Sequence, residues 1–514
     1  MKRYFKVIAL LIAFIITVSI VAGCGRRVNP STAGANLNVP TRGTAGTDAS
    51  GNIIEPTFPK RELPTTTEPD KLAGITSDTI YVGNTAGTTG ALASIGGPFN
   101  IGIQAAFSVY NSEGGYQGKK IALKHYDDGG VATQSITLME KLVYEDEVFA
   151  IVGNFASTCV AANLSVIKEG NIPMVYAAAG NDELLNEYAN GADAGIFPVQ
   201  PLNFTEGRMM ILRAFAPTDK GGMGGKKVGV LSNSNEASKT MLGGIQAEAD
   251  DQGLTNAINY QNATTSDFSA AVNAFKAAGC DVVVLTVIGD DFLSALLAMS
   301  NANYYPTVLT TYNNADVSKL NEGTVLAKQY ENVMENIPIF AQAWLDTSSL
   351  EFSYKNPDHG LFNTWLLINP SLKDSGVPGF TEEYWKVAED IYDYCIAEGK
   401  PVVDAWNMSF NSYALAGYIA GNLFCQGMKA LDAAGMPLSR ANFVYIMESQ
   451  EFKISMADTI SFANGMRAGV QTFALTMFYD TFKLEEGATS YHSAASTTVY
   501  PLMSIEEYRE MLQN

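Results

Sequence analysis

Residues 148–177 read VFAIVGNFASTCVAANLSVIKEGNIPMVYA and decide the fold class of this chain. Two short apolar runs, at 148–153 and 173–177, flank a longer amphipathic stretch from about Thr158 to Glu169. The runs predict buried strands, and the stretch between them predicts a helix. A strand, a helix and a second strand in this order form a right-handed unit with parallel strands. The segment therefore predicts an α/β fold built on a parallel sheet.

The same alternation continues on both sides of this segment. Upstream, runs at 80–83 and 121–126 predict strands, with a helix that opens at Pro98 and a second one around 136–144. The rhythm restarts after the glycine-rich residues 221–225, so we expect two α/β lobes of similar plan. Four further strands are predicted at 228–231, 257–260, 282–285 and 307–310, and three helices near 236–251, 266–278 and 291–301.

The chain changes character beyond about Pro338, where it becomes helical and aromatic. All four tryptophans lie in this region: Trp344, Trp365, Trp385 and Trp406. They are expected to pack an insertion against a lobe, and a ligand-facing aromatic wall is the alternative.

Composition excludes several function classes. The 514 residues are 47% hydrophobic and carry a net charge of −20. Such an acidic surface repels phosphate backbones, so no nucleic-acid partner is expected. Five cysteines and three histidines form neither a disulfide scaffold nor a zinc framework, so no metal or other cofactor is expected. Pairing among Cys159, Cys280, Cys395 and Cys425 stays open.

The N-terminus carries an export signal. Lys2, Arg3 and Lys6 precede an uncharged apolar run at 7–22, which is typical of a secretory signal peptide over 1–23. A plain transmembrane anchor is the alternative, but this run is shorter than the ~20 residues that span a bilayer. The proline-rich residues that follow predict a flexible linker over 24–75.

No enzymatic motif emerges from the rest of the chain. There is no H-E-x-x-H pair and no G-x-S-x-G elbow, and the glycine-rich run at 221–227 precedes its strand, whereas a phosphate loop follows one. Cys159 lacks the basic surroundings of a nucleophile. The strand end at 153–157 is instead suited to binding, because Phe155, Ala156 and Ser157 lead into a helix whose N-terminus attracts carboxylates. An ordinary helix cap is the alternative for Ser157.

Several motifs resemble one family. They are TGALASIG at 89–96, NSEGGYQGKKI at 111–121, YDD at 126–128, FAIVG at 149–153 and ISFANGMRAG at 460–469. In order and spacing these resemble the type 1 periplasmic binding proteins, above all the leucine/isoleucine/valine-binding proteins of ABC importers. The likeness covers about 76–335, fades through an atypical insertion at about 340–410, and returns weakly at 460–469. Val21, Ala22 and Gly23 before Cys24 similarly resemble a bacterial lipobox, which implies lipidation of Cys24.

The resemblance implies two doubly wound parallel-sheet lobes joined by three hinge crossovers, with the ligand trapped between the lobes. The implied crossovers lie near 199–203, near 333–338 and at about 460. The first lobe would comprise 76–200 with 338–460, and the second 201–337 with 461–514.

The resemblance also implies a set of ligand-binding positions. The ligand's α-carboxylate would bind Ser157 and backbone groups at Ala178, and a family threonine is replaced by Gly180. Family members hold the ammonium group of an amino acid with an acidic residue and tyrosines. At the position of the acidic residue this chain has Tyr312, and at the tyrosine positions it has apolar residues. Phe155 and Ala156 complete the predicted set, and the apolar replacements are Ala237, Ile288 and Ile95. Glu236, Asp290 and Asp291 could replace the lost acid.

The resulting expectation is an extracytoplasmic, lipid-anchored and monomeric solute-binding protein of an ABC importer, which works with a membrane permease. Asp127 and Asp128 are expected to structure a loop. A ligand-sensing lipoprotein without a transporter and an exported α/β hydrolase are the alternatives.

Overall fold

The computed structural model describes residues 63–314 and 380–513, except 410, 458 and 484–490, together with short strands at 46–47, 53–54, 345–346, 353–354 and 361–364. The predicted signal peptide, Cys24, most of the predicted linker and the predicted crossover at 333–338 lie outside these residues. No helix in the described ranges is both long and apolar enough to cross a membrane.

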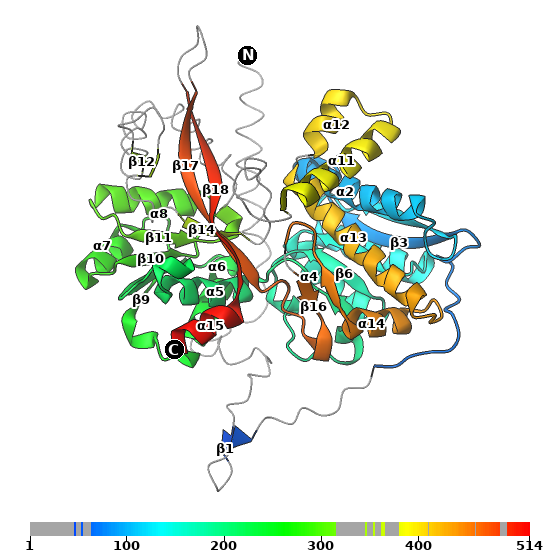
Figure 1. Cartoon of the computed structure of the whole chain (residues 1–514), viewed down its shortest axis with the longest axis horizontal. Coiled ribbons are helices and arrows are strands. Elements are labelled where there is room, and N and C mark those ends of the chain that lie inside the picture. Colours follow the sequence, from blue (N-terminus) through cyan, green and yellow to red (C-terminus); the bar gives the residue numbers. More distant parts are fainter. Residues whose placement is uncertain are drawn as a thin grey trace.

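The first lobe is built on a five-stranded parallel sheet (Figure 1). Its strands, in spatial order, are β4 (Lys120–Asp127), β3 (Thr79–Ala86), β5 (Ile151–Phe155), β6 (Met174–Ala178) and β7 (Ile196–Phe197). The helices that cover it are α2 (Ala93–Ser112), α13 (Ser412–Ala433), α3 (Ala132–Glu140) and α4 (Ser157–Glu169). Helices α2 and α13 pack on one face around Phe99, Phe107 and Phe424, and α3 and α4 pack in a separate cluster around Leu142 and Leu164.

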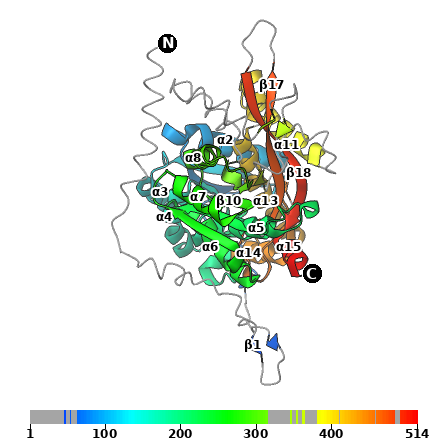
Figure 2. The same cartoon turned by 90° about the vertical axis from the view of Figure 1, so that its left-hand side faces the viewer.

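The second lobe holds a seven-stranded mixed sheet. Its strands, in spatial order, are β9 (Ile258–Ala263), β8 (Val228–Asn233), β10 (Val282–Leu285), β11 (Thr307–Thr310), β14 (Leu361–Thr364), β17 (Thr472–Lys483) and β18 (Tyr491–Ser504). The first five run parallel, whereas β17 and β18 form an antiparallel ribbon at one edge. Its helices are α5 (Asn203–Phe215), α6 (Glu236–Asp251), α7 (Ser269–Ala278), α8 (Asp290–Asn301) and α15 (Ile505–Gln513). Figure 2 views this lobe with α7 and α8 in front of β10.

The strands predicted from residues 80–83 to 307–310 all occur, so the α/β prediction is confirmed. The predicted start of the first helix is wrong, because α2 begins at Ala93 rather than at Pro98. A short 3-10 turn at Gly90–Leu92 starts the helical run early. Proline removes one backbone hydrogen bond from a helix, and the buried side chains of Phe99, Ile103 and Phe107 hold α2 to the sheet despite that loss.

Strand β14 departs from the predicted division into lobes. It lies inside 338–460, the range predicted for the first lobe, yet it pairs with β11 and β17 of the second lobe. The chain is therefore still in the second sheet at Thr364. It enters the first lobe by α11 (Phe380–Ala397), which packs on α2 and also contacts α12 (Val402–Ser409) and α13.

Two crossovers between the lobes lie side by side. One runs from β7 to α5, and the other from β16 (Thr459–Ser461) to β17. The amide of Val470 donates to the carbonyl of Val199 at 2.8 Å. Gly469 has φ +69°, and a Cβ there would lie 2.3 Å from the carbonyl oxygen of Gln200. Only glycine therefore permits this close approach, which ties the two connections together.

Candidate functional site

The carboxyl ends of β5 and β6 hold unusual backbone conformations. Ala156 has φ +69° and Tyr176 has φ +60°, both in the left-handed region that non-glycine residues avoid. Gly153 has φ +72°, and a Cβ there would lie 2.7 Å from the ring of Phe99. Strained backbone of this kind gathers at functional sites. These strand ends are therefore the first candidates for a ligand site.

Helix α4 begins at this strand end without a side-chain cap. Its N-cap residue is Ala156, which has no side chain able to accept from the first amides. Ser157 is the first helical residue and is exposed, so it does not serve as the ordinary cap that was the alternative for it. Its hydroxyl makes no hydrogen bond within the described residues. The start of α4 thus leaves backbone N–H groups for an anion, which the helix dipole also attracts.

Aromatic and small apolar side chains flank this helix start. The rings of Phe99 and Phe155 lie 5.4 Å apart, and those of Phe99 and Tyr176 lie 5.8 Å apart. These rings belong to the large apolar core of the first lobe, called here the Phe99 cluster, and four partly buried predicted residues pack against that core: Ile95, Ala156, Ala178 and Tyr312. Ala178 is also paired with Phe155 between β5 and β6, so these two predicted positions lie together at the strand ends.

Gly180 faces a side chain that no sequence motif indicates. A Cβ at Gly180 would lie 2.8 Å from Oδ1 of Asn203, the first residue of α5. The amide of Asn203 thus occupies the space that the family's threonine side chain would need. The backbone amide of Asn203 donates to the carbonyl of Gly180 at 3.2 Å, whereas its side-chain amide makes no hydrogen bond within the described residues. Asn203 is therefore a candidate ligand-binding residue.

Tyr312 belongs to the second lobe but is anchored at the first crossover. Its hydroxyl donates to the carbonyl of Pro201 at 3.0 Å, and its backbone amide donates to Glu206 at 2.7 Å. Burial raises the pKa of Tyr312 well above its usual value, and the nearby Glu206 and Tyr176 add to this shift. The phenol is therefore neutral, so Tyr312 cannot act as the anionic partner that the family provides there.

Glu206 is a buried carboxyl group beside this crossover. The side chain of Thr311 donates to it at 2.7 Å, and the residue has no exposed surface. Burial raises the pKa of Glu206 to about 8, although the bonds from Thr311 and Tyr312 oppose the shift. Near neutral pH this carboxyl group is therefore largely protonated, which spares the site a buried charge.

We expect Glu206 to make the protein less stable as pH rises. The folded state holds this proton up to a higher pH than the unfolded state does. The free energy of unfolding therefore falls as the pH rises from the ordinary pKa of 4.5 to the raised pKa of about 8. Glu206→Gln should flatten that slope in urea unfolding curves measured across the window. Glu236→Gln is the matched control, because that side chain is 86% exposed. Equal slopes in wild type and Glu206→Gln would contradict the assignment.

The remaining predicted residues of the second lobe lie apart from the Phe99 cluster. Ala237 and Ile288 pack at the edge of the apolar cluster that lies under α5 and α6. Of the three acids that could replace the missing family acid, Glu236 and Asp290 are exposed. Asp291 is engaged, because Asn233 donates to it at 2.7 Å. The structure therefore does not bring the three acids to the Phe99 cluster.

A second acid without a sequence signal, Asp182, joins the two lobes beside the site. The hydroxyl of Thr240 on α6 donates to its Oδ2 at 2.8 Å. Its Oδ1 is buried and accepts no hydrogen bond within the described residues. Burial raises the pKa of Asp182 to about 6, with the Thr240 bond opposing the shift. A buried acceptor without a donor is costly, so this oxygen is suited to a donor group of a ligand.

Asp127 and Asp128 organise the loop that follows β4. Asp127 accepts from the amides of Thr88 and Gly129, and Asp128 accepts from Gly130 and Ser135, so both structure their loop as expected.

The four cysteines of the described ranges are free and buried. Burial raises the pKa of Cys159 to about 11, which makes it a core residue and a poor nucleophile. Within these ranges, no cluster of three or more histidines, cysteines or acids could hold a metal.

The family model described as periplasmic binding protein matches residues 79–345, more than half of the chain. The chain belongs to this family. Members of the periplasmic binding protein family bind solutes outside the cytoplasm and are not enzymes, which removes the hydrolase alternative and supports an extracytoplasmic location.

Curated relatives of this periplasmic binding protein match part of its length. The Leu/Ile/Val-binding protein homolog 3 of Brucella melitensis is 30% identical over 207 residues, which cover 40% of this chain and 53% of that protein. The amino acid binding protein of Pseudomonas aeruginosa is 25% identical over 208 residues, or 40% of this chain and 52% of that protein. The chain spans about half the length of these relatives.

A solved structure agrees with the fold over most of the chain. The fatty acid ABC transporter substrate-binding protein from Thermomonospora curvata has a TM-score of 0.55 at 15% identity, covering 88% of this chain and 96% of that chain. The two lobes are therefore those of the type 1 periplasmic binding protein fold.

We expect Asn203 to contribute directly to binding. Asn203→Ala removes a side-chain amide that has no other partner in the described structure, so folding should be little affected. The loss of one hydrogen bond, about 1 kcal/mol, corresponds to a roughly fivefold weaker ligand affinity. Calorimetric titration would measure it, with Asn235→Ala as a control that removes a helix cap away from the Phe99 cluster. Unchanged affinity in Asn203→Ala would remove Asn203 from the site.

Proposed function

We propose that the chain is the extracytoplasmic solute-binding lipoprotein of an ABC importer. In this proposal it captures a small carboxylate-bearing solute, an amino acid or an amino-acid-like compound, between its lobes by hinge closure. The observation that carries the proposal is the uncapped start of α4 at Ser157, beside the partly buried Ala178 and the Phe99 cluster. In parallel α/β sheets, ligands bind beyond the carboxyl ends of the strands. A carboxylate at α4 with an apolar group on the cluster fits this geometry.

The ligand class follows from what the second lobe lacks. Tyr312 is neutral and bonded to Pro201, and Ala237 and Ile288 offer no polar side chain. Burying an ammonium group without a partner costs several kcal/mol, and about 1.4 kcal/mol already changes affinity tenfold. The preferred ligand is therefore a carboxylic acid with a larger apolar or aromatic part, and leucine, isoleucine and valine bind weakly.

One observation favours a second ligand class. Oδ1 of Asp182 is buried without a donor in the described structure, next to the interlobe contact with Thr240. An amino acid whose ammonium group reached this oxygen would have the partner that Tyr312 does not provide. The two ligand classes differ in whether the amino group strengthens or weakens binding.

Hinge closure is testable by small-angle X-ray scattering. Two crossovers are tied together at Val470 and Val199, which supports a compact hinge between the lobes. The radius of gyration should fall when a saturating carboxylic acid ligand is added. An unchanged scattering profile at saturation, with binding verified by calorimetry, would argue against a hinged capture mechanism.

The lipid anchor rests on the lipobox-like residues before Cys24, which lie outside the described structure. In a bacterial host that performs lipoprotein processing, the wild type should incorporate labelled palmitate and Cys24→Ser should not. Lack of label in the wild type would contradict the anchor.

The sensing alternative shares the fold and the ligand with the importer, so the neighbouring genes distinguish the two. Genes for a permease and an ATPase beside the gene of this chain would favour import. Their absence, together with a neighbouring signalling gene, would favour sensing.

A further inference from the structure

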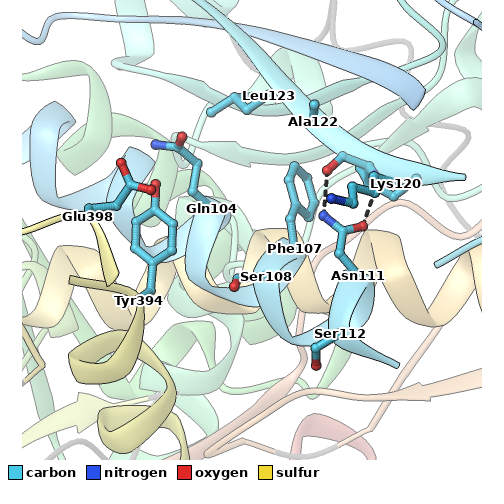
Figure 3. Close-up of a pocket in the computed structure, with 11 residues that line it drawn as sticks. Gln104, Phe107, Ser108, Asn111, Ser112, Lys120, Ala122, Leu123, Tyr394 and Glu398 are labelled. Carbon is cyan, nitrogen blue, oxygen red and sulfur yellow. Dashed lines mark hydrogen bonds between the residues drawn. The ribbon is translucent and has the colours of Figure 1, made fainter. Parts of the chain in front are cut away.

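A cavity lies in the first lobe, between α2, α11 and β4. Its volume is about 500 Å³ (Figure 3). Along α2, the residues that line it follow helical spacing and so share one face: Gln104, Phe107, Ser108 and Asn111. Strand β4 contributes Lys120 to Leu123, α11 contributes Tyr394, and the turn that follows α11 contributes Glu398. The cavity is distinct from the start of α4, because none of the predicted ligand-binding residues lines it.

The cavity exposes the free edge of a sheet. Strand β4 is an outer strand, with β3 as its one neighbour in the described structure. The amide of Lys120 donates toward β3, to Asp78, so the backbone groups of Ile121 and Leu123 point away from the sheet. Asn111 binds both groups of Ile121, accepting from its amide at 2.8 Å and donating to its carbonyl at 2.9 Å. The next outward pair, at Leu123, faces the cavity without a strand partner among the described residues.

Opposite charges mark the two ends of the cavity. Figure 3 shows Glu398 and Tyr394 beside Gln104 at one end, and Lys120 beside Asn111 at the other. Neither Glu398 nor Lys120 has an ion-pair partner among the described residues. The side chains of Gln104 and Asn111 are seven residues apart on α2, which corresponds to about 10 Å along the helix.

These dimensions select a ligand class. The charges of a single amino acid lie too close together to reach both ends. An extended chain spans about 3.3 Å per residue, so a tripeptide places its terminal charges about 10 Å apart. Its backbone can pair with Leu123 in the manner of strand addition at a sheet edge.

We propose that this cavity binds a short zwitterionic peptide of about three residues, antiparallel to β4. The N-terminal ammonium lies at Glu398, with the Tyr394 hydroxyl and the Gln104 amide as further hydrogen-bonding groups. The C-terminal carboxylate lies at Lys120. The bound peptide extends the five-stranded sheet by one short strand.

Calorimetric titration of the full chain with tri-alanine at low ionic strength tests this proposal. Binding should weaken about tenfold in Glu398→Gln and in Lys120→Gln, because each removes one charge-assisted contact. Glu389→Gln, on α11 but outside the cavity, and Lys71→Gln are the controls and should bind as the wild type does. Acetylated tri-alanine amide, which lacks both charges, and free alanine should bind much more weakly.

The outcomes separate this cavity from the interlobe site. Tri-alanine binding that survives Ser157→Asp but falls in the two cavity variants would support the peptide site, whatever ligand the interlobe site takes. Equal affinity for the capped peptide, no effect of Glu398→Gln and Lys120→Gln, or no binding at millimolar concentration would each overturn it.

Discussion

Ser157→Asp is expected to abolish binding of carboxylate ligands while leaving the protein folded. An acid in the first turn of a helix interacts favourably with the helix dipole, so α4 should be as stable as before or slightly more so. The same acid occupies the position proposed for the ligand's carboxylate. Placing like charges side by side costs several kcal/mol, which corresponds to at least a hundredfold loss of affinity.

The structure offers a control at another helix start. Ser269 is also an exposed first residue of a helix, α7, whose N-cap residue Phe268 gives no side-chain cap, although the carboxylate of Asp267 accepts from the Ser269 amide at 3.0 Å. Ser269→Asp therefore makes the same charge change at a helix start in the second lobe, outside the site, and should leave affinity unchanged. Calorimetric titration of both variants gives the comparison. Wild-type affinity in Ser157→Asp would place the carboxylate elsewhere.

Arg467→Met is expected to cost about 3–5 kcal/mol of unfolding free energy, because it leaves a buried carboxylate without its cation. Arg467 and its partner Glu448 are both buried. The guanidinium also donates to the carbonyl of Met466 at 2.9 Å, and lies 4.5 Å from the ring centre of Phe197. Backbone bonds between Arg467 and Asn186 join the same segment to the first lobe. The side chain thus fixes one end of a crossover.

Urea unfolding followed by circular dichroism would measure the effect. Lys168→Met is the control, since it breaks a partly exposed pair with Asp193 and should cost no more than about 1 kcal/mol. The double variant Arg467→Met with Glu448→Leu should recover part of the loss, because no charge then stays buried alone. A loss in Arg467→Met no larger than in Lys168→Met would contradict this role.

The strands and helices of the first two-thirds of the chain are predictable because their signals are local. An apolar run such as 282–285 has few alternatives to a buried strand, and its flanking turns set its limits. The position of β14 is not predictable in the same way. It joins β11 and β17, which are far from it in sequence, so its place depends on pairing rather than on its own four residues.

The residues of the candidate site likewise fall into those with a local sequence signal and those placed by long-range contacts. Phe155, Ala156 and Ser157 are consecutive, and the strand-to-helix pattern of the sequence is enough to place them at a strand end. Asn203 and Glu206 carry no such signal, because they belong to a helix that begins the second lobe. Their relevance comes from contacts with Gly180 and Thr311, which the fold brings together. The missing threonine at Gly180 is the one clue in the sequence that another side chain fills that space.

The central claim is that the site at α4 recognises a carboxylate and does not require an ammonium group. Calorimetric titration of leucine, 4-methylpentanoate (leucine without its amino group) and the corresponding 4-methylpentanamide tests it most directly. We predict that the acid binds at least tenfold more tightly than leucine, and that the amide, which lacks the carboxylate, does not bind measurably. Micromolar or tighter binding of leucine with 4-methylpentanoate inert would contradict the account.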